Sequence, residues 1–261
     1  MRIAALFLGL LLITMPARAN INPASFGSLS FHQHPGAQLP LDAVLTDAAG
    51  HPSTLGAAIF GRPAVVILEY LRCQNLCSLV LSGAVKAISD ARLVPGRDLD
   101  LVAVSIDPRE TAGDAAAAQA MYVKRLFNPA AGASSVRFFI AAPDQVRKIA
   151  EAIGFPYRYD PQTKQFAHPA GFVVTTPEGR ISRYVLGLYP PPSLLKQAVG
   201  EARLDKVEPP AHPLLLLCFG YDPDASTAAV LAMRLVRWTS LAIIAAIAGL
   251  IGFLSLRRRS A

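Results

Sequence analysis

The order of apolar and polar positions along the chain predicts strands and helices in alternation. Residues 64–70 are almost continuously apolar and rich in β-branched side chains, which is typical of a strand buried on both faces. Residues 78–90 carry apolar side chains at helical spacing, and residues 100–106 form a second buried apolar run. A strand, a helix and a second strand in this order indicate parallel strands joined by a crossover helix.

The rest of the central part continues this alternation. Further strands are predicted at residues 41–46, 136–141, 172–175 and 181–185, and further helices at residues 114–126, 143–153 and 192–204. The last two strands flank a turn and are expected to pair as a hairpin. Alternating strands and helices that end in a hairpin and a helix predict an α/β sandwich of the thioredoxin type over residues 41–204.

The beginning of the chain is typical of a secretory signal peptide over residues 1–19. Arg2 precedes an apolar stretch, and the small-x-small pattern of Ala17, Arg18 and Ala19 fits a cleavage site. The alternative is an uncleaved anchor, but the apolar stretch is shorter than the roughly 20 residues of a membrane span. A flexible lead-in rich in Ser, Gly, Pro and Asn follows over residues 20–40.

The other end predicts a transmembrane helix. Residues 238–256 contain no charged side chain and lie between Arg237 and Arg257, and Trp238 suits a membrane interface. The alternative is a buried core helix. If the body is exported, residues 205–237 form a linker and juxtamembrane segment, and residues 257–261 form a cytoplasmic tail.

The charge distribution argues against a nucleic-acid partner. The chain has a formal net charge of +7, with 25 basic and 18 acidic residues. Five of the basic residues lie within the signal peptide and the predicted tail, which leaves 20 basic against 18 acidic residues between them. This middle part has no basic run with interleaved aromatic residues that could follow a phosphate backbone.

The chemistry suggested by the sequence centres on Cys73 and Cys77. They follow the buried strand 64–70 and open the helix 78–90, so both sulfurs are expected on one helix face, one turn apart. A helix N-terminus favours the thiolate form of a cysteine. The pair suits metal binding, dithiol redox chemistry or a structural disulfide.

His168 favours the first of these alternatives. It follows a predicted loop at residues 160–165, which faces the cysteine-bearing helix in a thioredoxin-like layout. Two thiolates and an imidazole suit copper, because sulfur favours Cu(I) and imidazole tolerates Cu(II). A closed zinc site would need a fourth ligand. The alternative is an ordinary surface histidine.

In this order and spacing, the motifs of residues 40–204 resemble those of the Sco/SenC family, membrane-tethered thioredoxin-like proteins that bind copper for the assembly of cytochrome c oxidase. The resemblance rests on three motifs: Tyr70 before Cys73-x-x-x-Cys77, the strand end Val104-Ser-Ile-Asp-Pro108 with Thr111 behind it, and His168 before residues 172–175. Family members usually have proline after each cysteine, where this chain has Gln74 and Ser78. The C-terminal span indicates a bacterial subgroup, since an N-terminal anchor is common in the family.

The resemblance implies that Cys73, Cys77 and His168 bind Cu(I) or Cu(II), and that the cysteines form a redox-active pair that can close a disulfide. It places Asp107 near the site, where it either orients a ligand or caps the following turn. It implies a copper chaperone rather than an enzyme, acting on the binuclear copper site of cytochrome c oxidase. The expected partners are the copper-bearing oxidase subunit and an upstream copper donor or thiol reductase. The expected location is the bacterial inner membrane, with a single span and the domain in the periplasm.

Two other functions remain open at this stage. A thiol-disulfide oxidoreductase that keeps target cysteines reduced would need only Cys73 and Cys77, although such enzymes usually have two residues between the cysteines. A peroxidase-like detoxifier would use one reactive and one resolving cysteine. Cys218 is either a further thiol of the site or a buried cysteine of an apolar segment, and His32 and His34 either bind metal or belong to a solvated tail.

Overall fold

The computed structural model describes residues 29–59, 61–72, 77–161 and 164–210, together with scattered positions between 238 and 249. The predicted signal peptide, Cys73, Cys218 and the predicted tail at residues 257–261 lie outside the described residues. Cys77 is described only through its backbone.

The centre of the domain is a seven-stranded mixed sheet with the strand order β2-β1-β5-β4-β3-β8-β9. Strands β3, β4 and β5 are parallel, whereas β1 and β8 run antiparallel to β5 and β3, respectively. Every residue of β3 and β4 is buried, which explains their continuous apolar runs. The bounds are β1 Val44–Asp47, β2 Pro52–Thr54, β3 Ala64–Glu69, β4 Asp100–Ser105, β5 Val136–Ile140, β8 Gly171–Thr175 and β9 Ile181–Leu186.

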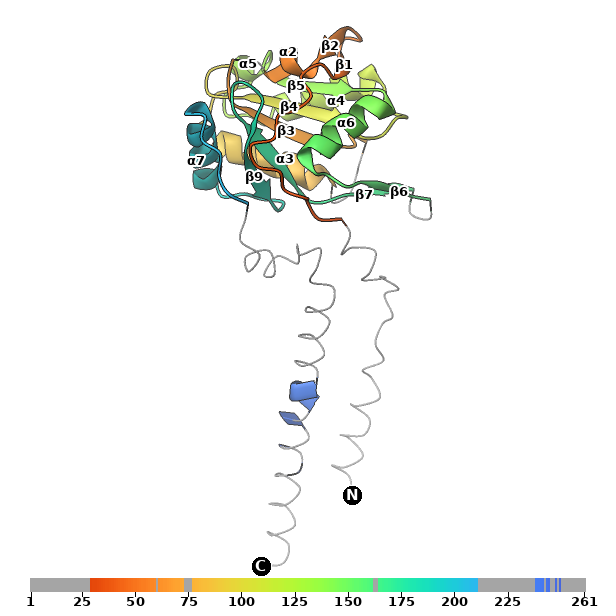
Figure 1. The fold of residues 1–261 in the computed structure, drawn as a ribbon, viewed down its shortest axis with the longest axis vertical. Helices are drawn as coiled ribbons and strands as arrows, with labels where there is room; N and C mark the ends of the chain where they lie inside the picture. The colour runs from red at the N-terminus through yellow and green to blue at the C-terminus, as the bar shows by residue number, and fades with distance from the viewer. Residues whose placement is uncertain are drawn as a thin grey trace, which may run out of the picture.

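Helices cover both faces of this sheet (Figure 1). Helices α3, α4 and α7 pack on one face through one apolar cluster, and α2 and α6 pack on the other face through a second cluster. Side chains of β3 alternate between the two clusters, so both faces of the strand contribute to the core. The bounds are α2 Leu55–Ile59, α3 Cys77–Asp90, α4 Ala112–Val123, α5 Pro129–Gly132, α6 Pro143–Ile153 and α7 Pro192–Arg203.

Helix α3, which begins at Cys77, lies unusually close to the segment between β9 and α7. A Cβ atom on Gly83 would lie 1.8 Å from the carbonyl oxygen of Leu188, so only glycine allows this approach. The contact fixes the position of the helix that carries the second cysteine.

The α/β sandwich predicted from the sequence is confirmed, with three local differences. The short elements β2, α2 and α5 were not predicted. Helix α4 begins and ends earlier than the predicted helix 114–126. The predicted loop 160–165 is the tip of a two-stranded ribbon, in which β6 (Arg158–Asp160) pairs with β7 (Gln165–Ala167) and which projects from the domain (Figure 1).

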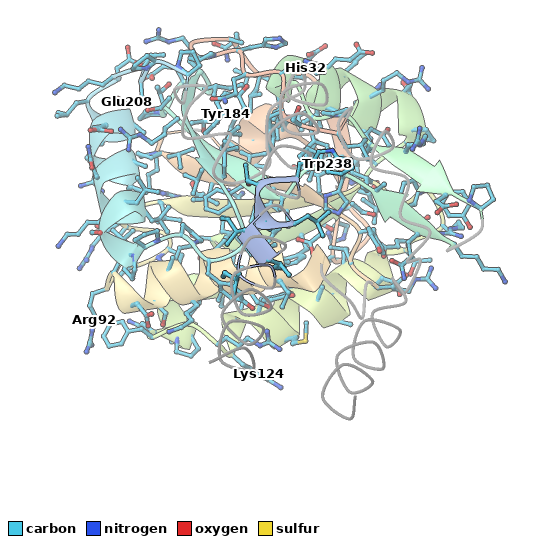
Figure 2. All side chains as sticks on the ribbon, turned by 90° about the horizontal axis from the view of Figure 1, so that it is seen from below. His32, Arg92, Lys124, Tyr184, Glu208 and Trp238 are labelled. Atoms are coloured by element: carbon cyan, nitrogen blue, oxygen red, sulfur yellow. The ribbon has the colours of Figure 1, made fainter. Side chains whose placement is uncertain are left out.

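The described part of the predicted lead-in is packed against the domain rather than loose. Phe31 is buried against Phe155 and Tyr184, and the amide of His32 donates a hydrogen bond of 2.8 Å to the Gly154 carbonyl. After α7 the chain returns to the sheet, where the Glu208 amide donates to Ser182. His32, Tyr184 and Glu208 lie along one side of the domain in Figure 2.

The predicted span at residues 238–256 lies mostly outside the described residues. The described positions within it are helical and exposed, with apolar side chains at Trp238, Leu241, Ile243, Ile244 and Ile247. Among the residues that the structure describes, no helix has both the length and the apolar character needed to cross a membrane.

Candidate metal centre

The imidazole of His168 is held in a fixed orientation at the end of the β6–β7 ribbon. Its Nδ1 atom lies 2.9 Å from the carbonyl oxygen of Pro169. Its ring packs against Phe155 and Tyr70, with centroid distances of 5.5 Å and 6.2 Å. The Nε2 atom is buried, and within the described part of the chain it has no hydrogen-bond partner.

These contacts determine the chemical form of the ring. A carbonyl oxygen can only accept, so the Nδ1 atom carries the proton that bonds to Pro169 and the Nε2 atom carries a lone pair. Burial lowers the pKa of His168, and this effect exceeds the opposing effect of the Pro169 hydrogen bond. The imidazole is therefore neutral at neutral pH, which is the form that binds metal ions.

Tyr70 connects His168 to the segment that carries the cysteines. Its ring contacts both His168 and Phe166, the latter at a centroid distance of 5.8 Å. Tyr70 directly follows β3 and precedes Cys73 by three residues, a distance that the chain spans in at most about 11 Å. The fold thus brings His168 near the start of the cysteine segment, whereas the thiol of Cys73 lies outside the described residues.

Asp107 forms a close ion pair with Arg109. Its carboxylate accepts hydrogen bonds of 2.7 Å from both Nε and Nη2 of the guanidinium, and one of 2.9 Å from the Arg109 amide. Burial alone would raise the pKa of Asp107, but the hydrogen bonds and charge of Arg109 outweigh it and lower that pKa. These contacts are those of a turn cap, and a role in orienting a ligand stays a prediction.

Glu110 is a buried carboxylate of the same loop that the sequence analysis did not single out. It accepts hydrogen bonds from the amides of Leu71 and Arg72, at 2.9 Å and 2.6 Å, and from the hydroxyl of Ser105 at 2.5 Å. The pairing of β3 with β4 offers a signal for it, because Glu69 lies opposite Ser105 at the ends of the two parallel strands. The segments that follow these two strands must therefore meet.

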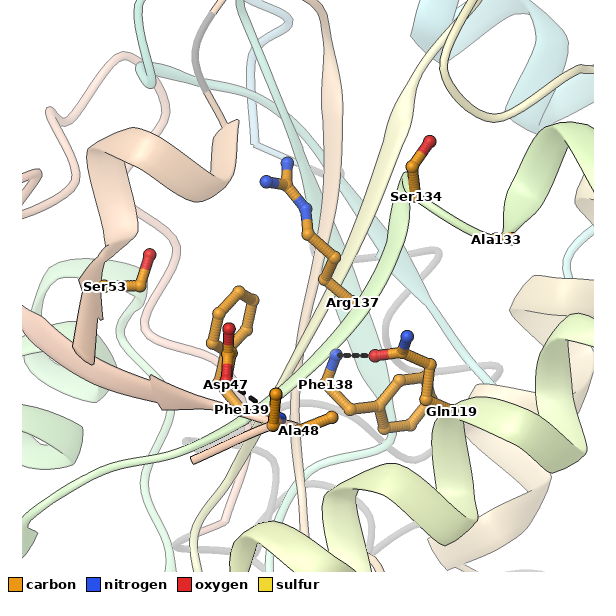
Figure 3. A pocket seen from close by; sticks show the side chains of 10 residues that line it. Asp47, Ala48, Ser53, Gln119, Ala133, Ser134, Arg137, Phe138 and Phe139 are labelled. Atoms are coloured by element: carbon orange, nitrogen blue, oxygen red, sulfur yellow. Dashed lines mark hydrogen bonds between the residues drawn. The ribbon is translucent and has the colours of Figure 1, made fainter. Parts of the chain in front are cut away.

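A groove of about 380 Å³ is lined by residues of the loop after β4, of α6 and of the ribbon, among them Arg109, Tyr157 and Phe166. His168 is not among its lining residues. The Arg109 guanidinium stands 4.9 Å from the centroid of the Tyr159 ring, which closes one side of the groove. A second hollow of about 390 Å³ lies around Arg137, whose guanidinium donates to carbonyls of α2 (Figure 3). It contains none of the predicted site residues.

The described residues do not by themselves complete a metal site. Within them, no group of three or more histidine, cysteine, aspartate or glutamate side chains is arranged to hold a metal ion. Cys73 and the side chain of Cys77 lie outside this part. Of the three predicted ligands, the structure therefore describes the side chain of His168 alone, together with the backbone on either side of residues 73–76.

Several solved structures resemble this chain. A protein of Aquifex aeolicus with a suggested role in electron transfer is 25% identical, with a TM-score of 0.57, and the match covers 64% of this chain and 94% of that one. Copper-bound ScoI of Arabidopsis thaliana is 20% identical, with a TM-score of 0.51, over 65% of this chain and 98% of that one. BsSco, described with a disulfide switch as a Sco-family cytochrome c oxidase assembly protein, is 13% identical, with a TM-score of 0.50, over 65% and 96%.

These likenesses and the mixed sheet confirm the thioredoxin-like α/β fold. No curated protein sequence matches the chain. The family model for SCO1/SenC matches residues 37–203, which is more than half of the chain and includes Cys73, Cys77, Asp107 and His168. The chain therefore belongs to the SCO1/SenC family.

Proposed function

We propose that this chain binds copper through Cys73, Cys77 and His168 and serves in the assembly of the binuclear copper site of cytochrome c oxidase. The observation that carries the proposal is the state of His168: a neutral imidazole with its Nδ1 proton held by Pro169 and a buried Nε2 lone pair. A buried polar atom without a partner costs about 1–3 kcal/mol, and coordination of a metal ion removes this cost.

The donor set fits copper better than other metals. Two thiolates favour Cu(I), and an imidazole extends the range to Cu(II). The backbone contact to Nδ1 sets the tautomer that leaves Nε2 free, which is the usual arrangement around a metal-binding histidine. The copper bound to Arabidopsis ScoI and the description of BsSco as an oxidase assembly protein support the same function.

The proposal includes export and a membrane tether. Residues 1–19 would direct export, and residues 238–256 would anchor the domain to the bacterial inner membrane on the periplasmic side. The exposed apolar side chains of the described positions between 238 and 247 support this part. The partners would be the copper-bearing oxidase subunit and an upstream copper donor or thiol reductase.

Copper binding is tested on the full chain, purified in mild detergent and reduced without oxygen. Competition with a chromogenic Cu(I) chelator should give one tightly bound copper per chain. Cys73→Ser and Cys77→Ser should abolish this binding, and His168→Ala should weaken it by more than the about 10–100-fold that loss of an outer hydrogen bond typically causes. The control is His51→Ala, which removes an exposed imidazole that pairs with Asp47.

Two results would contradict the proposal. Unchanged copper affinity of the His168→Ala variant would exclude the three-ligand site. Failure of the wild-type chain to retain copper would favour the alternative function, a thiol-disulfide oxidoreductase. Reduction of a disulfide substrate would then depend on Cys73 and Cys77 and proceed equally well in the His168→Ala variant.

A further inference from the structure

The backbone that leads into Cys73 is held by a carboxylate from a different loop. Glu110 follows β4, yet its two oxygens accept the amide protons of Leu71 and Arg72, the last residues before Cys73. Glu110 as a residue is 5% exposed, and the hydroxyl of Ser105 donates a third hydrogen bond to its carboxylate. Among the described residues, no lysine or arginine forms an ion pair with it.

The environment of Glu110 suits its role as an acceptor for the amides of Leu71 and Arg72, an arrangement called the clamp below. Three donors surround the carboxylate, two of them backbone amides, and hydrogen bonds to a charged acceptor are stronger than those between neutral groups. An apolar side chain at this position would leave both amide protons without this acceptor, and glutamine would offer one acceptor oxygen in place of two. Glu110 is almost fully buried, so water has little access to the position of its carboxylate.

Arg72 adds a second connection between the same two segments. Its Nη2 donates a hydrogen bond of 2.6 Å to the Arg109 carbonyl, and its Nε lies 3.4 Å from the carboxylate of Asp114. Asp114 is itself held in a capping box with Thr111 at the start of α4. The backbone before Cys73 is therefore attached, through Arg72, to the capped N-terminus of α4.

The four residues 73–76 lie between two points that the fold holds in place. Leu71 and Arg72 are clamped by Glu110 at one end, and α3 begins at Cys77 at the other, where Gly83 packs against Leu188. The described backbone on both sides of residues 73–76 is therefore held by contacts from other elements.

We infer that Glu110 is a positioning residue for the cysteine pair: through the amides of Leu71 and Arg72 it sets the backbone from which Cys73 is presented. It acts on the backbone and is not itself a ligand. The inference rests on the proposed function where copper is concerned. It also applies to the dithiol alone, because a positioned pair closes a disulfide more readily than a loose one.

The experiment compares the full chain with its Glu110→Gln and Glu110→Ala variants in detergent. Three quantities are measured: hydrogen exchange of peptides containing residues 71 and 72, Cu(I) affinity, and the equilibrium with glutathione disulfide. In that equilibrium, the two thiols form one disulfide and glutathione disulfide takes up two electrons and two protons to become two glutathione molecules. We expect exchange at residues 71 and 72 to rise, and copper affinity to fall by at least about tenfold, as for other outer-sphere contacts.

The Asp100→Asn variant is the matched control. Asp100 is a fully buried carboxylate at the opposite end of β4, where it pairs with Arg62 at 3.1 Å. The Asp100→Asn substitution should lower the stability of the domain without changing hydrogen exchange at residues 71 and 72 or the affinity for copper. If both Glu110 variants fail to fold, Ser105→Ala keeps the carboxylate, removes one of its three hydrogen bonds and should give smaller changes in the same direction.

Each result decides the inference. Unchanged exchange at residues 71 and 72 would overturn the clamp. Faster exchange with wild-type copper affinity and a wild-type disulfide equilibrium would reduce Glu110 to a structural residue and overturn its positioning role. If the wild-type chain holds no copper, the proposed function fails on its own, and the shift of the disulfide equilibrium alone decides whether Glu110 positions the pair.

Discussion

Replacing Phe155 by leucine should remove part of the packing around the His168 imidazole and so give water access to it. Phe155 is 3% exposed and packs against His168 at a centroid distance of 5.5 Å. It also forms aromatic pairs with Phe31 at 5.5 Å and with Tyr157 at 6.4 Å. At about 0.5–1.5 kcal/mol for each of these two pairs, the substitution should lower the free energy of unfolding by about 1–3 kcal/mol. A domain of ordinary stability, about 5–15 kcal/mol, remains folded after this loss.

The informative readout is the titration of His168. Burial lowers its pKa in the wild-type chain, so admission of water should move that pKa back toward its ordinary value. Histidine ring signals are followed by NMR between about pH 4 and 8, a range centred near the ordinary histidine pKa. Comparison with the His168→Asn variant identifies the signal.

Phe138→Leu is the matched control for this substitution. Phe138 is fully buried on the other face of the sheet, where it stacks on Tyr122 at 5.7 Å. Its loss should lower stability by a comparable amount and leave the titration of His168 unchanged. The reasoning fails if the Phe155→Leu variant titrates like the wild type, or if both variants shift the pKa of His168 equally.

Two further predictions concern pH and the N-terminal segment. Because folding lowers the pKa of His168, its neutral form stabilises the copper-free chain above the unfolded-state value of about 6.5, and this contribution is lost as the pH falls toward the folded pKa. Denaturant titrations at several pH values should show this loss in the wild type and a flatter profile in His168→Asn; identical profiles would contradict it. Gly154→Ala should release the segment at His32, because the new Cβ would lie 1.8 Å from the His32 carbonyl oxygen and the residue has a φ of +65°. Gly50→Ala is the control, because Gly50 has a φ of +86° but an added Cβ would meet no atom within 4 Å. This variant carries the backbone strain without a clash, so an equal loss of stability in both variants would show that the contact between Gly154 and His32 is unimportant.

The elements that the sequence predicts well are those whose own side chains determine their burial. Strands β3 and β4 are buried along their full length, so their apolar runs need no partner to be recognised. Helix α6 shows a strong amphipathic pattern and ends at Gly154 in the left-handed conformation, which is a typical stop signal.

The ribbon of β6 and β7 could not be predicted in this way. Its strands have three residues each, too few to show a period of two. It is stabilised by the cross-strand rings of Tyr159 and Phe166, 5.2 Å apart, and by Arg109 from a loop 50 residues earlier. Contacts of this range depend on the fold and leave no local pattern in the sequence.

In the candidate site, too, some residues are predictable from the sequence and others only from the fold. The order of the motifs was sufficient to single out His168, but the partner of its Nδ1 atom and the rings that bury it are visible only in the structure. Glu110 carried no chemical motif, because its importance arises from the parallel pairing of β3 with β4, which brings two loop segments together. A residue that acts on a backbone amide is hard to predict from residue types alone.

The His168 side of the proposed site is held independently of the cysteine side, and this independence bears on how copper would be released. The His168 side depends on packing and one backbone hydrogen bond, none of which involves a cysteine. It would keep its form whether Cys73 and Cys77 are thiols or a disulfide. Preorganisation of this kind reduces the cost of binding. Oxidation of the pair would then remove both sulfur ligands and leave a single imidazole, which cannot retain Cu(I) tightly. Under the proposed function, the redox state of the cysteines is therefore sufficient to control copper binding, and the histidine needs no conformational change.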